Sequence, residues 1–212
     1  CKLLQHIASP KDELEGCGLA LDPQGKWVAL LQCNLRNRPV VDIHSVATGR
    51  KIVRLGGLPN AEVQSSSSRP LIRLISSPCG KQLAVVTGKG LVTLYDPLTG
   101  KRSRPFTSVP TPDHRGTNAF AFSPDAREVA ITGMSQLCIC STVDGRPRPT
   151  SGHGGWVNEL DFSPDGRHLC STSSDRTVRI WALGEGRQTR VLSGFGLDTI
   201  AVRYAPDGRH LA

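Results

Sequence analysis

Residues 152–181 contain the side-chain types of a hydrolytic site. His153, Ser171, Ser173 and Asp175 lie on one short stretch that ends at Trp181. A serine that is activated by a histidine, which an aspartate orients, is the arrangement of a nucleophilic hydrolase. The same side chains could instead form a buried hydrogen-bonded set that stabilises a fold. The choice depends on whether the stretch occurs once or belongs to a repeated unit.

The stretch is one of five related units. Each unit has a short apolar strand, a turn that contains a proline, and a second apolar strand; the prolines are Pro23, Pro78, Pro124, Pro164 and Pro206. Their spacings of 55, 46, 40 and 42 residues are close to the period of about 40–45 residues at which a four-stranded propeller blade repeats. Apolar residues alternate before each proline, which predicts a strand with one buried face. The alternating pairs are Leu19/Leu21, Leu74/Ser76, Phe120/Phe122, Leu160/Phe162 and Val202/Tyr204, and only Ser76 breaks the pattern.

A second landmark follows in four of the units. It is a glycine followed by a basic residue, at Gly49-Arg50, Gly100-Lys101, Gly145-Arg146 and Gly186-Arg187. Five residues before each glycine, after an aliphatic residue, the chain has His44, Tyr95, Cys140 or Trp181. We therefore expect one structural position, here called the tryptophan slot, to be filled in four different ways.

The unit from Gly152 to Trp181 resembles a WD repeat. It has the Gly-His dipeptide at 152–153, the Ser-Pro-Asp-Gly turn at 163–166, Asp175 and Trp181. The aspartate that usually follows the tryptophan is replaced by Ala182, whereas another unit keeps a Tyr95-Asp96 version. The resemblance implies an all-β fold, a WD-repeat β-propeller that serves as a platform for protein assembly. We expect about four complete four-stranded blades, with partial blades at both ends and an incomplete ring.

The repeats predict a division of the chain into segments. Residues 1–10 would be the last strand of a preceding blade, and residues 198–212 the start of a further one. The four blades would span 17–58, 71–108, 118–150 and 156–193. Because the chain starts at Cys1 without Met and stops at Ala212 within the repeat pattern, we expect a fragment of a larger multi-repeat protein.

The resemblance also gives an answer for the hydrolase-like residues. In WD repeats a His, a Ser or Thr, an Asp and a Trp form a buried structural tetrad, which here implies His153, Asp175, Trp181 and either Ser171 or Ser173. Both serines remain candidates, because residues two apart on a strand share a face. A catalytic serine would need an exposed nucleophile and oxyanion donors, and the sequence has no nucleophile elbow such as Gly-x-Ser-x-Gly. We therefore expect no catalytic residue and no enzyme activity.

The net charge of +8 favours acidic partners. Alternate turns of a four-stranded blade lie at the same edge, so both kinds of landmark turn would present their basic residues together. This possible basic binding face comprises Lys26, Arg50, Lys81, Lys101, Arg127, Arg146, Arg167, Arg187 and Arg209. Asp125, Asp165 and Asp207 lie two residues before three of these arginines, so ordinary turn chemistry is the alternative explanation.

The sequence indicates no cofactor and no metal site. Seven cysteines are irregularly spaced, and the pair Cys138/Cys140 has no second Cys/His pair at finger-like spacing. Small buried thiols in a reducing compartment are the simpler interpretation. No run of 18 apolar residues occurs, so we expect no membrane span. Two long loops, 56–70 with its Ser65 to Ser68 cluster and 104–118, are candidates for binding or for tolerated insertions.

Two function classes remain, and they overlap. The first is a non-catalytic protein–protein interaction scaffold whose partners are other proteins. The second is a polyanion-binding module for RNA or acidic cytoskeletal tails. Aromatic residues make up 5% of the chain, which disfavours nucleic acid because base stacking needs aromatic side chains. We expect an intracellular, cytoplasmic location, with nuclear and cytoskeletal or ciliary locations as alternatives.

Overall fold

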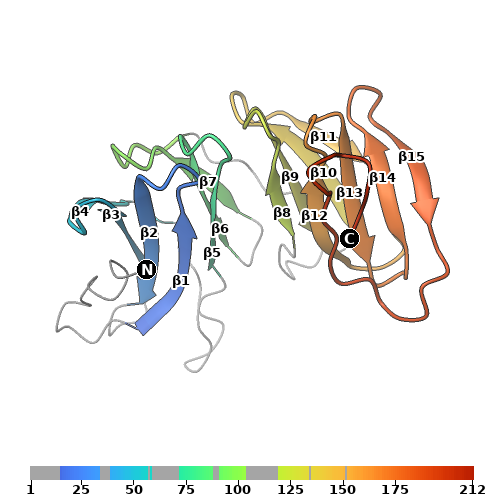
Figure 1. Ribbon diagram of the computed structural model, residues 1–212, viewed down its shortest axis with the longest axis horizontal. Coiled ribbons are helices and arrows are strands. Elements are labelled where there is room, and N and C mark those ends of the chain that lie inside the picture. Colours follow the sequence, from blue (N-terminus) through green and yellow to red (C-terminus); the bar gives the residue numbers. More distant parts are fainter. Residues whose placement is uncertain are drawn as a thin grey trace. The chain divides into compact units, whose positions relative to one another are not determined.

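The computed structural model describes residues 15–33, 39–56, 58, 72–87, 91–103, 119–133, 135–150 and 152–212. The chain divides into two compact units, Cys1–Pro105 and Phe106–Ala212. All secondary-structure elements of the described residues are β-strands (Figure 1). In the same part of the chain, no helix is long and apolar enough to span a membrane. The strand expected within residues 1–10 and most of both long loops lie outside the described residues.

The first unit contains two antiparallel sheets. One has four strands in sequence order, β1 (Glu15–Leu21), β2 (Trp27–Cys33), β3 (Pro39–Ser45) and β4 (Lys51–Arg54). The other has three strands, β5 (Ile72–Ser76), β6 (Leu83–Thr87) and β7 (Val92–Tyr95). Where its expected fourth strand would begin, a single bridge joins Tyr95 to Arg102, and the Ser103 N–H donates to the Leu94 carbonyl. The described part of this second blade therefore has three full strands instead of four.

The second unit contains two four-stranded antiparallel sheets. The third sheet of the chain comprises β8 (Phe120–Phe122), β9 (Glu128–Gly133), β10 (Gln136–Ser141) and β11 (Pro147–Thr150). The fourth comprises β12 (Val157–Phe162), β13 (His168–Ser173), β14 (Val178–Ala182) and β15 (Arg187–Leu192). Residues 198–212 form a further short pairing between Tyr204 and Leu211. They pack on the fourth sheet, where Val202 joins an apolar cluster with Cys170 and Val178.

Strand pairing shows that the tryptophan slot is one structural position. Its occupant pairs with the second strand at the residue five positions after the landmark proline in all four sheets. The pairs are Val28 with His44, Leu83 with Tyr95, Val129 with Cys140, and Leu169 with Trp181. The four sheets are thus copies of one repeated unit, as expected for propeller blades.

The burial of the first strand differs from the sequence prediction. Leu160 and Phe162 on β12 are buried in a core with residues of the third sheet, but Leu19 and Leu21 at the equivalent positions of β1 are 56% and 51% exposed. Side chains alternate between the two faces of a strand, and on β1 it is Ala20 that joins the core between the first two sheets. Leu19 and Leu21 therefore lie on the opposite face, away from that core.

The turns after the landmark prolines require a left-handed backbone. Gly25, Gly80, Gly166 and Gly208 have φ values of 68° to 71°, a region that costs other residues about 1–2 kcal/mol. In the third blade Ala126 occupies this position with φ 58°. The turn geometry is thus retained where the glycine is not.

Candidate functional site

The hydrolase-like residues of the fourth blade meet in one hydrogen-bonded chain. Trp181 Nε1 donates to Ser171 Oγ at 2.9 Å, and Ser171 Oγ lies 2.7 Å from His153 Nε2. His153 Nδ1 lies 3.0 Å from Asp175 Oδ2. Strand β14 supplies the tryptophan and β13 the serine, whereas the histidine precedes β12 and the aspartate is in the β13–β14 turn. The chain of bonds therefore ties two strands and two loops of one blade together.

The direction of each hydrogen bond follows from the first donor. The indole N–H of Trp181 can only donate, so the Ser171 hydroxyl accepts it and has its own proton free to donate to His153 Nε2. His153 then carries its proton on Nδ1 and donates it to Asp175. Burial, with a smaller contribution from the positive charge of Arg179, lowers the pKa of His153 although the Asp175 carboxylate acts to raise it. The ring is therefore neutral at neutral pH, as this bonding order requires.

Asp175 stays ionised in spite of its partial burial. Burial acts to raise its pKa, but hydrogen bonds from the Thr177 hydroxyl, the Gly154 N–H and His153 together hold that pKa well below its usual range. Thr177 Oγ1 lies 2.6 Å from Asp175 Oδ1. Thr177 is not among the residues predicted from the sequence. Its position two residues after the turn aspartate is the signal that could have identified it, because hydroxyls there bond back to the turn.

The structure distinguishes between the two candidate serines. Ser171 is part of the chain between Trp181 and His153. Ser173 is also buried, but its hydroxyl accepts the backbone N–H of Asp175 at 3.0 Å. Ser173 therefore stabilises the turn that contains Asp175, and the hydrogen bond of its hydroxyl is to that turn and not to His153.

This arrangement is suited to stability and not to nucleophilic attack. Ser171 is 0% exposed and Trp181 2% exposed, so a substrate carbonyl has no route to the Ser171 hydroxyl. The position that a substrate would need on Oγ is already occupied by the indole N–H. The net contribution of one such hydrogen bond to the free energy of unfolding is about 0.5–1.5 kcal/mol, and a buried group left without its partner lowers that free energy by about 1–3 kcal/mol.

The other occupants of the tryptophan slot are held differently. Tyr95 is fully buried, and burial raises its pKa. His44 Nδ1 lies 3.2 Å from the Gly49 carbonyl oxygen. Cys140 is buried with its sulfur 3.6 Å from that of Cys138, and both are free thiols. Their contact lowers the pKa of Cys138 and raises that of Cys140. Among the described residues, no cluster of three or more metal-ligating side chains accompanies this pair.

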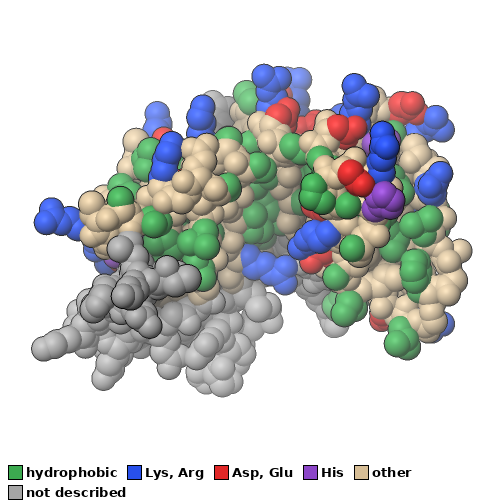
Figure 2. Space-filling model, in the orientation of Figure 1, with side chains coloured by type: hydrophobic (Ala, Val, Ile, Leu, Met, Phe, Trp, Pro, Cys, Tyr) green, Lys and Arg blue, Asp and Glu red, His purple; other side chains and the backbone are tan. Residues whose placement is uncertain are grey.

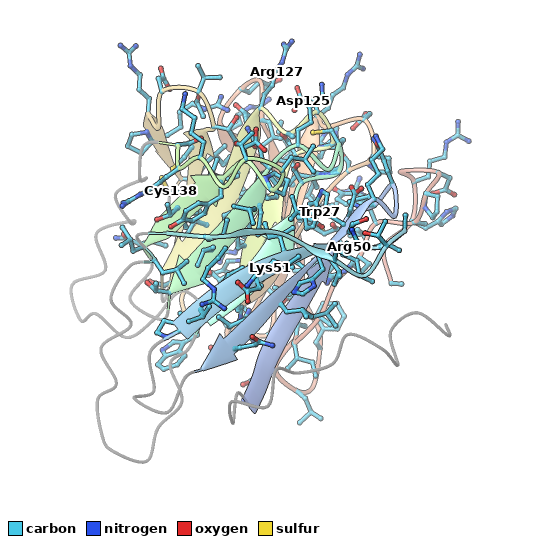
Figure 3. All side chains as sticks on the ribbon, turned by 90° about the vertical axis from the view of Figure 1, so that its left-hand side faces the viewer. Trp27, Arg50, Lys51, Asp125, Arg127 and Cys138 are labelled. Atoms are coloured by element: carbon cyan, nitrogen blue, oxygen red, sulfur yellow. The ribbon has the colours of Figure 1, made fainter. Side chains whose placement is uncertain are left out.

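The nine residues of the possible basic binding face are all exposed. Lys26, Lys81, Arg127 and Arg167 lie between the first and second strands of their sheets, and Arg50, Lys101, Arg146 and Arg187 follow the turn after the third strand; Figure 1 labels these strands. Figure 3 shows Arg50 beside the turn that follows β3, and Arg127 close to Asp125 in the third blade. The structure thus places eight of the nine in turns and Arg187 at the first residue of β15, and whether they bind a partner stays a prediction.

The opposite edge of the fourth blade carries exposed apolar side chains. They belong to the loop before β12 and to residues 193–201, and the exposed fractions are 45% for Trp156, 43% for Phe195, 82% for Leu197 and 74% for Ile200. The backbone of this edge is ordered by hydrogen bonds. The Trp156 N–H donates to Ser174 Oγ, and Thr199 Oγ1 donates to the Ser173 carbonyl at 2.9 Å. We call these four side chains the apolar loop edge; the sequence analysis did not identify them.

Comparison with known proteins supports the repeat assignment. Residues 145–182 match the family model "WD domain, G-beta repeat". The chain is 30% identical over 94 residues to a guanine nucleotide-binding protein subunit beta of Schizosaccharomyces pombe, a match over 43% of this chain and 30% of that protein. It is 33% identical over 137 residues to an uncharacterised WD-repeat-containing protein of Synechocystis, over 62% of this chain and 37% of the relative. A lissencephaly-1 homologue of Paramecium tetraurelia is 40% identical over 63 residues, 29% of this chain and 16% of that protein. The matches thus span well under half of each relative.

Proposed function

The chain is a WD-repeat protein built from propeller-type blades, and on that premise we propose that it is a non-catalytic scaffold that binds other proteins. WD-repeat proteins generally mediate protein–protein interactions. The hydrogen-bonded chain around Ser171 supports a structural role for the residues that resemble a hydrolytic site, because its hydroxyl is both buried and fully engaged.

The apolar loop edge is the observation that carries this proposal. Leu197 and Ile200 are exposed over most of their surface, and Trp156 lies on a neighbouring loop of the same blade. Exposed apolar groups of this kind mark interaction sites, and aromatic residues are enriched in the cores of protein interfaces. The backbone bonds through Thr199 and Ser174 present these side chains without a need for reordering on binding, which lowers the entropic cost of association.

A triple variant tests the proposal. Trp156→Ser, Leu197→Ser and Ile200→Ser together remove three of the four side chains of the apolar loop edge and leave Phe195, while the Thr199 and Ser174 bonds remain. Proteins captured by the full-length protein from cells are identified and quantified, and we expect the variant to lose at least one partner about tenfold, which corresponds to about 1.4 kcal/mol. Val143→Ser is the control, since Val143 is 85% exposed on a turn of the third blade. Equal recovery of every partner by wild type, triple variant and control would refute a role for this edge.

A further inference from the structure

The positive charge of the chain belongs entirely to its first unit. Residues 1–105 contain 15 Lys and Arg against 7 Asp and Glu, whereas residues 106–212 contain 11 of each. The net charge of +8 is therefore carried by one unit, and the other is neutral. A field of one sign over one part of a protein attracts partners of the opposite sign.

The basic turn residues of the two units differ in the same way. In the second unit, acids of the same turn form ion pairs with three of the five arginines: Arg146 Nε lies 3.3 Å from Asp144 Oδ2, and Arg187 pairs with Glu185. Arg127 is within 4.0 Å of Asp125. In the first unit Lys26, Arg50, Lys81 and Lys101 are exposed, and among the described residues none of the four forms an ion pair. In the described part of this unit, Asp42 on β3 instead pairs with Arg54 and with Lys51, the residue that follows Arg50.

The turns that carry these four cations contact one another. The Val46 N–H donates to the Lys26 carbonyl at 3.0 Å, and Trp27 Nε1 donates to the Gly80 carbonyl at 3.1 Å, which joins the turn of the first blade to that of the second. Gly100 lies against Val53 of β4, because a Cβ added there would come within 2.7 Å of that side chain. We call Lys26, Arg50, Lys81 and Lys101 the basic turn edge. Figure 2 shows few acidic side chains among the basic ones on this unit, and more on the other.

The carboxylates near these turns are either buried or accept hydrogen bonds from backbone N–H groups of their own turn. Asp22 is 5% exposed, and its Oδ2 accepts the Lys26 backbone N–H at 2.8 Å. Asp96 accepts the N–H groups of Leu98 and Thr99. Neither carboxylate reaches a lysine or arginine side chain of the edge, so the four cations stay available to a partner.

We propose that the basic turn edge binds an acidic segment of a partner protein, an inference that rests on the proposed scaffold function. The structure favours a protein segment over single-stranded nucleic acid. The described aromatic side chains of this unit, Trp27 and Tyr95, are 1% and 0% exposed, so neither can stack on a base. Four cations on adjacent turns, without stacking groups between them, suit carboxylates spaced along an extended chain.

Two matched variants test this proposal. Lys26→Ser/Arg50→Ser/Lys81→Ser/Lys101→Ser removes the basic turn edge, and Arg127→Ser/Arg146→Ser/Arg167→Ser/Arg187→Ser removes four arginines from the equivalent turns of the second unit. Both lower the net charge by the same amount. Both should keep the fold, because at six of these eight positions the turn bond comes from the backbone N–H group.

The probe is a fluorescein-labelled dodecapeptide of Glu and Ser, measured by anisotropy with the full-length protein. We expect the first variant to weaken binding at least about tenfold and to flatten its salt dependence, and the second to change it less than about twofold. A peptide with Gln in place of Glu should not bind.

Four results would overturn the inference: no binding of the Glu peptide to the wild type, equal losses in both variants, tighter binding of a uridine homopolymer through the same four residues, or undiminished capture of every cellular partner by the first variant. The partner-capture experiment described above separates this failure from failure of the scaffold function. If the first variant still captures every cellular partner of the wild type, the scaffold stands and the acidic-segment site does not.

Discussion

At the residue scale, Ser171 holds the centre of the fourth blade. Its hydroxyl accepts from Trp181 and donates to His153, and both neighbours are almost fully buried. If this hydroxyl is lost, the Trp181 N–H and His153 Nε2 therefore cannot form replacement hydrogen bonds with bulk water. Ser173 is equally buried but serves only the backbone of Asp175, so the two serines differ in the number of groups that depend on them.

This difference predicts unequal effects of two similar substitutions. Ser171→Ala leaves the Trp181 N–H and His153 Nε2 unpaired and should lower the free energy of unfolding by about 2–4 kcal/mol. Ser173→Ala removes one hydrogen bond and should cost about 0.5–1.5 kcal/mol. Urea denaturation followed by circular dichroism measures both. Equal costs would show that the chain of bonds through Ser171 does not stabilise the blade, and a hydrolytic activity that Ser171→Ala abolishes without a change in stability would restore the catalytic interpretation.

At the scale of the elements, neighbouring blades are joined through their turns. Gly80 and Gly25 have nearly the same φ, 68° and 71°, but their surroundings differ. A Cβ on Gly80 would lie 2.0 Å from Asp22 Oδ1 of the first blade, whereas nothing lies within 4 Å of one on Gly25.

Gly25→Ala should therefore show the backbone cost alone, about 1–2 kcal/mol. Gly80→Ala should add the cost of displacing the Asp22 side chain, a further about 1–3 kcal/mol. Thermal unfolding of the two variants and the wild type checks this order. A Gly80→Ala protein as stable as Gly25→Ala would mean that the turns of the first two blades do not meet as described.

The repeat pattern predicts the strands better than it predicts their surroundings. Proline spacing and the Gly-basic landmark identify the tryptophan slot, because turn geometry fixes the register of the strands that it joins. The pattern cannot tell which face of β1 is covered, so Leu19 and Leu21 were expected to be buried and are exposed. It also cannot choose between Ser171 and Ser173, because residues two apart on a strand lie on the same face. Nor does it identify Thr177. These distinctions depend on contacts between segments far apart in the chain.

At the scale of the whole molecule, the two units use the same turns with different charge chemistry. The second unit places an acid beside most of its turn arginines, so its charges cancel locally. The first unit lacks those acids at the equivalent positions, where Gln24 and Cys79 follow the landmark prolines in place of aspartate. One repeated fold thus gives a neutral unit and a strongly basic one.

This asymmetry predicts that salt stabilises only one of the two units. Like charges in the first unit repel one another over a screening length of about 30 Å at 0.01 M salt, which falls to about 10 Å at 0.1 M, and self-repulsion opposes the folded state. Raising NaCl from about 0.01 to about 0.2 M should therefore slow amide hydrogen exchange several-fold in β2 and β6, because exchange reports local opening. In β9 and β13 it should be unchanged or slightly faster, since salt there screens pairs of opposite charge. Mass spectrometry of peptides from each strand resolves the two units within one intact protein.

In the Lys26→Ser/Arg50→Ser/Lys81→Ser/Lys101→Ser variant the effect of salt on exchange in β2 and β6 should shrink, because half of the excess charge is gone. An equal response of both units to salt, or a response that the variant retains in full, would show that the concentrated charge of the first unit does not limit its stability.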